Sequence, residues 1–217
     1  MSKKITIMPW TLALSLLLLG GCGAEKKANE TDNTALSAYL EPDIYFEKAI
    51  EYLEADDIES SLSEIDKAAK FINTIIIKND SIHANIIEFA LGELDDLSDV
   101  IINDSLPSTS QLRDVFSSID LSISRYHFVA IEDWIKNEKN DKWSLERMRR
   151  ALFRTQYAIN HAEIQLTEEE EKELSKAIED VAKADRASLS LWQRLKATQE
   201  KFDRLVQENS NPLDGTF

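Results

Sequence analysis

Apolar residues recur every three or four positions along most of the chain from residue 43 to residue 211. This spacing gathers them on one face of a helix, and each such face needs a partner to cover it. The stripes predict helices near residues 43–55, 57–78, 81–103, 109–137, 144–166 and 168–209. We therefore expect an all-α fold, an antiparallel bundle of five or six helices around one core.

The scarcity of turn-forming residues supports this prediction. Gly92 and Pro107 are the only glycine and proline between residues 43 and 211. A sheet protein of this length needs many turns, and these two residue types supply most of them. Only the stretch 71–77 is ambiguous, because Ile75, Ile76 and Ile77 also favour a strand. The helical stripe that passes through Ile76 makes helix the preferred interpretation.

Capping residues indicate where several of the helices begin. Three pairs have the spacing of a capping box: Asp56 with Glu59, Ser108 with Gln111, and Thr167 with Glu170. Ser144 stands where it would cap the helix predicted near 144–166.

The first 21 residues have the order of a secretory leader. Lys3 and Lys4 precede an apolar run over residues 5–19, which is shorter than the ~20 residues of a membrane-spanning helix. The sequence Leu19-Gly20-Gly21-Cys22 then resembles the lipobox of a bacterial lipoprotein precursor. The resemblance implies cleavage between Gly21 and Cys22 and attachment of lipid to Cys22, the only cysteine. The alternative is an ordinary leader, or an uncleaved anchor, followed by an incidental cysteine.

The domain organisation follows from these segments. We predict a lipoprotein signal peptide over 1–21, a flexible polar tether over 22–41, a helical bundle domain over 42–211 and a tail over 212–217. The lipobox resemblance implies a lipid-anchored protein of the cell envelope. In a Gram-negative host, Gly23 after the cysteine, where aspartate would retain the protein in the inner membrane, implies the outer membrane facing the periplasm.

Charge is distributed unevenly along the chain. The net charge of −15 argues against nucleic acid as a partner, because phosphate contacts need a basic face. Residues 41–105 contain 17 acidic and 4 basic side chains, whereas residues 106–217 contain 20 and 17. Basic residues interleaved with aromatic ones form a possible partner surface: Lys136, Lys139, Lys142, Arg147, Arg150 and Arg154. The alternative is that they cover the outer face of one helix and pair with the acidic half.

The sequence offers little support for catalysis or for a cofactor. His83, His127 and His161 lie on three different predicted helices and are weak candidates for metal ligands. The paired Glu-x-x-His spacing of di-iron bundles is absent, so histidines satisfied in the interior are the default. Nucleophile elbows and glycine-rich phosphate loops are also absent from the sequence. We therefore predict neither a catalytic residue nor a cofactor.

Together these features favour a lipid-anchored envelope protein with a non-catalytic binding or scaffolding role and an envelope protein as its partner. The alternative is a ligand-binding or metal-binding bundle that uses its core histidines. The sequence also leaves open a duplication, since Ala49-Ile50-Glu51 recurs as Ala130-Ile131-Glu132, and chance accounts for this equally well.

Overall fold

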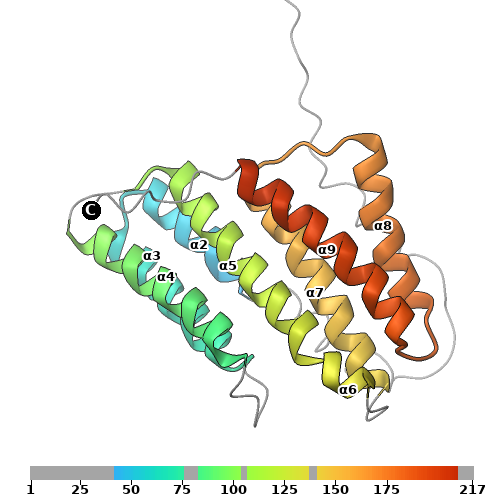
Figure 1. Ribbon diagram of the computed structural model, residues 1–217. Helices are drawn as coiled ribbons and strands as arrows, with labels where there is room; N and C mark the ends of the chain where they lie inside the picture. The colour runs from blue at the N-terminus through green and yellow to red at the C-terminus, as the bar shows by residue number, and fades with distance from the viewer. Residues whose placement is uncertain (1–41, 76–82, 104–106, 137–140, 210–217) are drawn as a thin grey trace, which may run out of the picture. The chain divides into compact units, whose positions relative to one another are not determined.

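The computed structural model describes residues 42–75, 83–103, 107–136 and 141–209. The predicted signal peptide, the whole of the predicted tether and the tail lie outside these residues. The described helices are α2 (Asp43–Glu54), α3 (Ile58–Asn73), α4 (Ala84–Ile102), α5 (Thr109–Ala130), α6 (Glu132–Lys136), α7 (Asp141–His161), α8 (Glu168–Lys183) and α9 (Leu189–Asn209). No strand occurs in the described residues, and the predicted all-α bundle is confirmed (Figure 1).

Helix α5 occupies the centre of the bundle. It packs against α2 and α4 on one side and against α7 and α9 on the other, while α3 and α8 lie farther out (Figure 1). Because neighbours enclose it, 14 of its 22 residues are buried, among them the polar residues Ser117, Asp120, Ser124 and His127. A polar group on such a helix has to find its partner on another helix.

The core is divided between the two sides of α5. Phe46, Leu94 and Phe116 belong to the cluster shared with α2, α3 and α4. Met148 and Trp192 belong to a cluster shared with α7, α8 and α9. Among the described helices, α5 and α7 form the most extensive contact.

Hydroxyl groups cross this contact. Ser117 Oγ donates to the carbonyl oxygen of Ala158 at 2.8 Å, and Ser124 Oγ donates to that of Ala151 at 2.9 Å. All four residues are buried. The α5–α7 pair is therefore fixed by hydrogen bonds as well as by packing.

The helix starts largely follow the predicted capping chemistry. Both capping boxes led by Ser108 and Thr167 are formed. In α3, however, the cap is Asp57, whose side chain accepts from Ser60 N at 3.1 Å, and Asp56 instead takes a left-handed φ of 57°. Ser144 is also not a cap, because α7 already begins at Asp141 and Ser144 is buried within it.

The range 168–209, predicted as one helix, is two. Helix α8 ends where Ala184 becomes extended, and Ser188 Oγ accepts from Leu191 N at 3.2 Å at the start of α9. The sequence hides this turn because its apolar spacing continues through it without a glycine or a proline. The reversal lets Val181 and Leu191 join the same cluster against α7.

Other boundaries differ by shorter lengths. The helix predicted to reach residue 137 is interrupted after Ala130, with α6 following, and α3 ends at Asn73. Ile76 and Ile77 of the ambiguous stretch lie outside the described residues. The suggested duplication gains no support, because residues 49–51 lie inside α2 whereas residues 130–132 span the break between α5 and α6.

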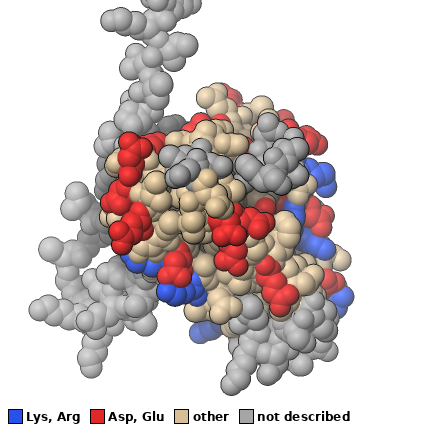
Figure 2. All heavy atoms as spheres, turned by 90° about the vertical axis from the view of Figure 1, so that its left-hand side faces the viewer, with Lys and Arg blue, Asp and Glu red and all other residues tan. Residues whose placement is uncertain are grey.

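The side of the bundle that carries α3 and α4 is acidic. Figure 2 shows red carboxylate side chains predominating over blue basic ones on this face. Its exposed carboxylates include Glu59, Asp66, Glu88, Asp95 and Asp99. The uneven charge of the sequence is thus an uneven charge in space. None of the helices in the described parts has the length and apolar character needed to cross a membrane.

Candidate functional site

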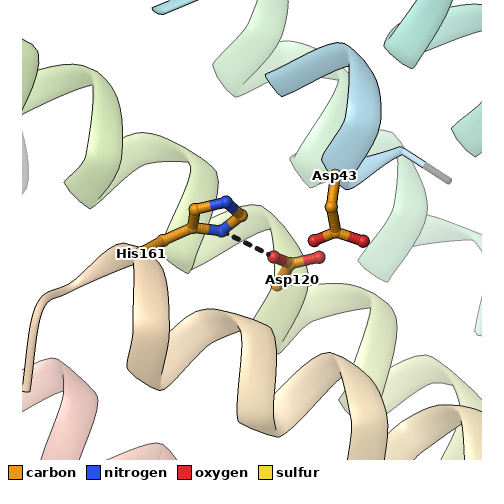
Figure 3. Close-up of side chains that lie close together, drawn as sticks. All are labelled: Asp43, Asp120 and His161. Carbon is orange, nitrogen blue, oxygen red and sulfur yellow. Dashed lines mark hydrogen bonds and ion pairs between the residues drawn. The ribbon is translucent and has the colours of Figure 1, made fainter. Parts of the chain in front are cut away.

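A cluster of four ionisable side chains lies buried where α2, α5 and α7 meet. Asp43 comes from the first turn of α2, Asp120 from the middle of α5, and Arg154 and His161 from α7. Each of the four is at most 5% exposed. Figure 3 shows the two carboxylates and the imidazole turned toward one another between the three helices.

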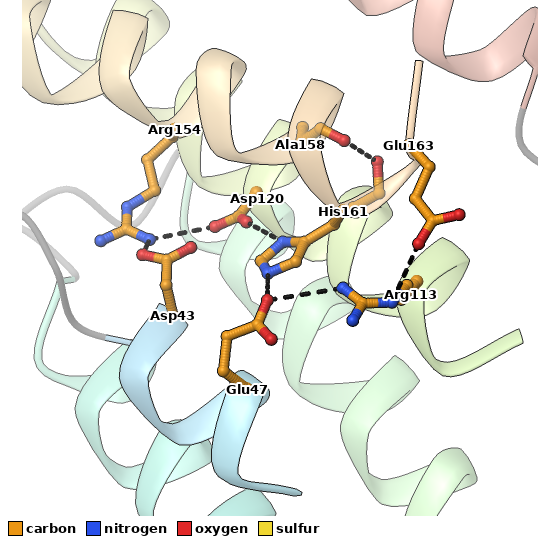
Figure 4. Close-up of polar contacts among 9 residues, drawn as sticks. Asp43, Glu47, Arg113, Asp120, Arg154, Ala158, His161 and Glu163 are labelled. Atoms are coloured by element: carbon orange, nitrogen blue, oxygen red, sulfur yellow. Dashed lines mark hydrogen bonds and ion pairs between the residues drawn. The ribbon is translucent and has the colours of Figure 1, made fainter. Parts of the chain in front are cut away.

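Arg154 joins the two carboxylates. Its Nη1 donates to Asp43 Oδ2 and also to Asp120 Oδ1, the latter at 3.1 Å (Figure 4). Burial alone would lower the pKa of Arg154, but the two carboxylates outweigh burial and raise it. The guanidinium is therefore the cation around which the cluster is built. Its ring-face contact with Tyr157, 5.5 Å from the ring centroid, covers it further.

His161 occupies the other side of Asp120. Its Nδ1 lies 3.0 Å from Asp120 Oδ2, and its Nε2 lies 3.4 Å from Oε1 of Glu47 on α2. Burial alone would lower the pKa of His161, but the hydrogen bonds to Asp120 and Glu47 and the nearby charges raise it to about 9. At neutral pH the ring is therefore a cation that donates from both nitrogens.

Asp43 is the least satisfied member. Burial, followed by repulsion from Asp120, raises the pKa of Asp43 well above its usual range. Its Oδ2 accepts from Arg154, whereas its buried Oδ1 has no hydrogen-bond partner among the residues that the structure describes. The first turn of a helix, where Asp43 stands, is a favourable place for a carboxylate.

Aromatic rings and a second ion pair enclose the cluster. Phe46 and Phe116 stack with ring centroids 4.2 Å apart, and both present themselves edge-on to His161. Toward solvent, Arg113 lies 3.5 Å from Glu47 and 3.4 Å from Glu163 (Figure 4). A hollow of about 90 Å³ lined by Arg113, Asp114 and His161 is the opening on this side.

Three of these residues have the composition of a metal site. Asp43, Asp120 and His161 each offer a ligand atom, and the three atoms lie within 4.8 Å of one another. The surrounding charges do not fit a metal ion, however, because the positive charges of Arg154 and His161 already balance the two carboxylates. A protonated imidazole also has no lone pair to give. The arrangement fits a buried salt-bridge network better than a metal centre.

The three predicted histidines do not converge. Only His161 meets carboxylates in the group just described. His127 contacts Arg147, which is 14 residues and therefore about 20 Å along α7 from His161. His83 lies at the start of α4.

The predicted partner surface is also divided by the structure. Arg154 is buried in the cluster, so it is not available to a partner. Lys136 lies 2.7 Å from Glu132, and Arg150 lies 3.3 Å from Glu146. Lys142 is exposed, Arg147 is partly buried, and Lys139 lies outside the described residues.

Sequence reasoning missed Asp43, Glu47 and Asp120. One signal for Asp120 was present: it lies between Phe116 and Ile123 in a helix whose apolar residues cover most of its circumference. A carboxylate there has to be buried with a counter-ion. Asp43 and Glu47 gave no such signal, because their role depends on how α2 meets α7.

Comparisons with protein-family models, with curated proteins and with solved structures found no match. The function of the cluster therefore has to be argued from its own geometry.

Removing the central cation should destabilise the bundle severely. In Arg154→Met two buried carboxylates lose their counter-ion, which costs about 3–5 kcal/mol of the free energy of unfolding. Urea denaturation followed by circular dichroism at pH 7 measures the loss. The matched control is Arg194→Met, which removes an exposed ion pair to Asp180 and should change stability by less than about 1 kcal/mol. Equal losses in the two variants would contradict a structural role for the network.

The stabilising contribution of His161 should depend on pH. Its pKa of about 9 lies above the ordinary value of 6.5, so its stabilisation is complete below pH 6.5 and disappears as the pH rises through 9. The difference in unfolding free energy between the wild type and His161→Gln should shrink by an amount on the order of 3 kcal/mol between pH 6 and pH 9.5. Glu47→Gln removes only the half-exposed carboxylate beside His161 and leaves Asp120 in place. This variant should therefore retain part of the dependence of unfolding free energy on pH. A difference that stays constant with pH would show that His161 is not charged in the folded protein.

Proposed function

We propose that this chain is a lipid-anchored protein of the bacterial cell envelope whose helical domain binds a partner without catalysing a reaction. The single observation that supports a non-catalytic binding role is the buried network of Asp43, Asp120, Arg154 and His161. Arg154 and His161, its two cations, are both paired with carboxylates inside the bundle. The first half is supported by the lipobox resemblance of Leu19-Gly20-Gly21-Cys22.

The anchor proposal depends on the order of features in the leader. A positive head, an apolar run, two glycines and the only cysteine follow one another as in lipoprotein precursors. A diacylglyceryl group on Cys22 and a further acyl chain would hold the protein on a membrane stably, where one chain would not. The polar tether over 22–41 would then separate the bundle from the lipid surface. In a Gram-negative host, Gly23 after the cysteine favours the outer membrane, with the bundle in the periplasm.

The state of His161 supports binding over catalysis. A general base needs an unprotonated nitrogen directed at its substrate. Both nitrogens of His161 contact carboxylates, and its pKa of about 9 keeps it protonated at neutral pH. What the network does accomplish is to tie α2, α5 and α7 to one another through directional contacts. A bundle fixed in this way is a rigid platform for a partner.

The N-terminal part of α7 is the surface best suited to an anionic partner. Lys142, Arg147 and Arg150 remain at least partly accessible there, with Trp143 among them. The acidic face over α3 and α4 would repel the same partner, so binding would be directed to one side.

A second candidate function is metal binding at Asp43, Asp120 and His161. The proximity of their ligand atoms favours it, and the guanidinium of Arg154 opposes it. Saturable zinc binding by the wild-type chain in calorimetry, lost in His161→Ala, would favour this candidate over the first.

Replacing the lipidated residue tests the anchor. Cys22→Ser should leave an uncleaved precursor, because the modifying enzyme needs the thiol. Intact mass and membrane fractionation of the wild type and the variant measure this. A wild-type chain with an unmodified residue 22, or identical fractionation of the two proteins, would refute the anchor.

Charge reversal on α7 tests the partner surface. After crosslinking in cells, capture of the wild type should recover an acidic envelope protein. Recovery should fall by at least about fivefold when Lys142 and Arg150 are both changed to Glu. The matched control changes Lys172 and Lys176, both exposed on α8, to Glu. Equal recovery with the two double variants would contradict the surface, and no partner under any growth condition would contradict the binding role.

A further inference from the structure

One face of α7 carries a regular series of cationic and aromatic side chains. Successive members are separated by three or four residues: Trp143, Arg147, Arg150, Arg154, Tyr157 and His161. At the C-terminal end of this series, Arg154 and His161 contact carboxylates of α2 and α5. The N-terminal end is built differently.

Arg147 is a partly buried cation that has no anionic partner among the described residues. Its Nη1 contacts His127 Nδ1 at 3.0 Å and the carbonyl oxygen of Ile75 at 3.5 Å. Among the described residues no carboxylate lies within ion-pair distance of Arg147. Burial, followed by the nearby charge of Arg150, lowers the pKa of Arg147 to about 10, so it is still charged at neutral pH. Its environment nevertheless disfavours that charge.

His127 contacts Arg147 but does not neutralise its positive charge. Because an arginine can only donate, Nδ1 of His127 accepts the hydrogen bond and its ring is neutral. Burial and the charges of Arg147, Arg150 and Arg154 lower the pKa of His127 well below its usual value. Glu146, whose charge also acts on Arg147, contacts Arg149 and Arg150 instead.

Aromatic rings form a wall beside Arg147. Its guanidinium lies 5.0 Å from the ring centroid of Trp143, and the ring of Trp143 lies 4.7 Å from that of Trp134 on α6. One turn before Arg147, buried Ser144 has a hydroxyl group without a hydrogen-bond partner. Among the described residues, this region therefore combines a cation without an anionic partner, a hydroxyl group without a hydrogen-bond partner and two neighbouring indole rings.

We propose that Arg147, with Arg150 and the Trp134–Trp143 pair, binds an oxyanion, a carboxylate or a phosphate, borne by a small ligand with a flat apolar body. The planar guanidinium has donors left to grip two oxygens of such a group. The tryptophans would cover the body of the ligand. This inference goes beyond the proposed function: it assigns a small ligand to part of the same α7 surface and requires neither the lipid anchor nor the protein partner.

Titration of the purified full chain tests the ligand class. The probes are benzoate, phenyl phosphate, inorganic phosphate and benzyl alcohol, with tryptophan fluorescence and calorimetry as readouts. We expect saturable binding of at least one aromatic oxyanion, at least about fivefold tighter than inorganic phosphate, and no saturable binding of benzyl alcohol. Absence of saturable binding for both aromatic oxyanions would overturn the site. Equal affinity for inorganic phosphate would overturn the role of the tryptophans, and equal affinity for benzyl alcohol would overturn that of the arginines.

Variants of α7 locate the site. Arg147→Met should weaken binding of the aromatic oxyanion by at least about tenfold, and Arg147→Lys, which keeps the charge but not the fork, should weaken it less. The control Arg149→Met removes a neighbouring arginine that contacts Glu146, and should leave affinity unchanged. Thermal melts monitor folding of every variant, and the lysine variant keeps the test valid if the methionine variant unfolds. Equal weakening by the control would overturn the assignment. Fractionation and capture experiments fail or succeed independently of this titration, so the two proposals are distinguishable.

Discussion

The carboxylate of Asp120 imposes the main constraint on this structure, because it has no exposure to solvent. It stands in the middle of α5, a helix that neighbours enclose on nearly every side. A charge in that position has to be neutralised by groups from other helices. Arg154 and His161 of α7 supply them, and Asp43 of α2 shares the guanidinium. The positions of three helices are thereby linked through one side chain.

Such a network is a costly way to stabilise a core. Each buried charge loses its hydration, and apolar residues of similar volume often stabilise a protein as well or better. What the network adds is specificity, because hydrogen bonds are directional. Those of Arg154 and His161 are satisfied in one arrangement of α2, α5 and α7. The hydroxyl bridges from Ser117 and Ser124 to α7 act in the same way on the same helix pair. We interpret these contacts as selecting one packing of a bundle whose apolar faces alone would permit several.

The sequence predicted the fold more completely than the site, for physical reasons. Helices are local, so apolar spacing and the capping boxes of Ser108 and Thr167 identified them. The turn between α8 and α9 was not predicted, because the apolar spacing of three or four residues continues through Ser188 without a break. The cluster depends on contacts between residues more than 30 positions apart, such as Asp120 with Arg154. No local pattern encodes that contact, although a carboxylate on an enclosed helix indicates that one has to exist.

The two ends of the α7 series make a comparison within one helix. Arg154 and Arg147 lie two turns apart on the same face, yet within the described ranges only Arg154 of the two meets carboxylates. If stability alone had shaped this face, an apolar residue at 147 would avoid both the desolvation of a cation and the repulsion from Arg150. Departures from internal consistency in a folded protein tend to occur where function requires them. The charge of Arg147, which no described carboxylate balances, is such a departure. An anion from outside the described residues would pair with Arg147 as Asp43 and Asp120 pair with Arg154.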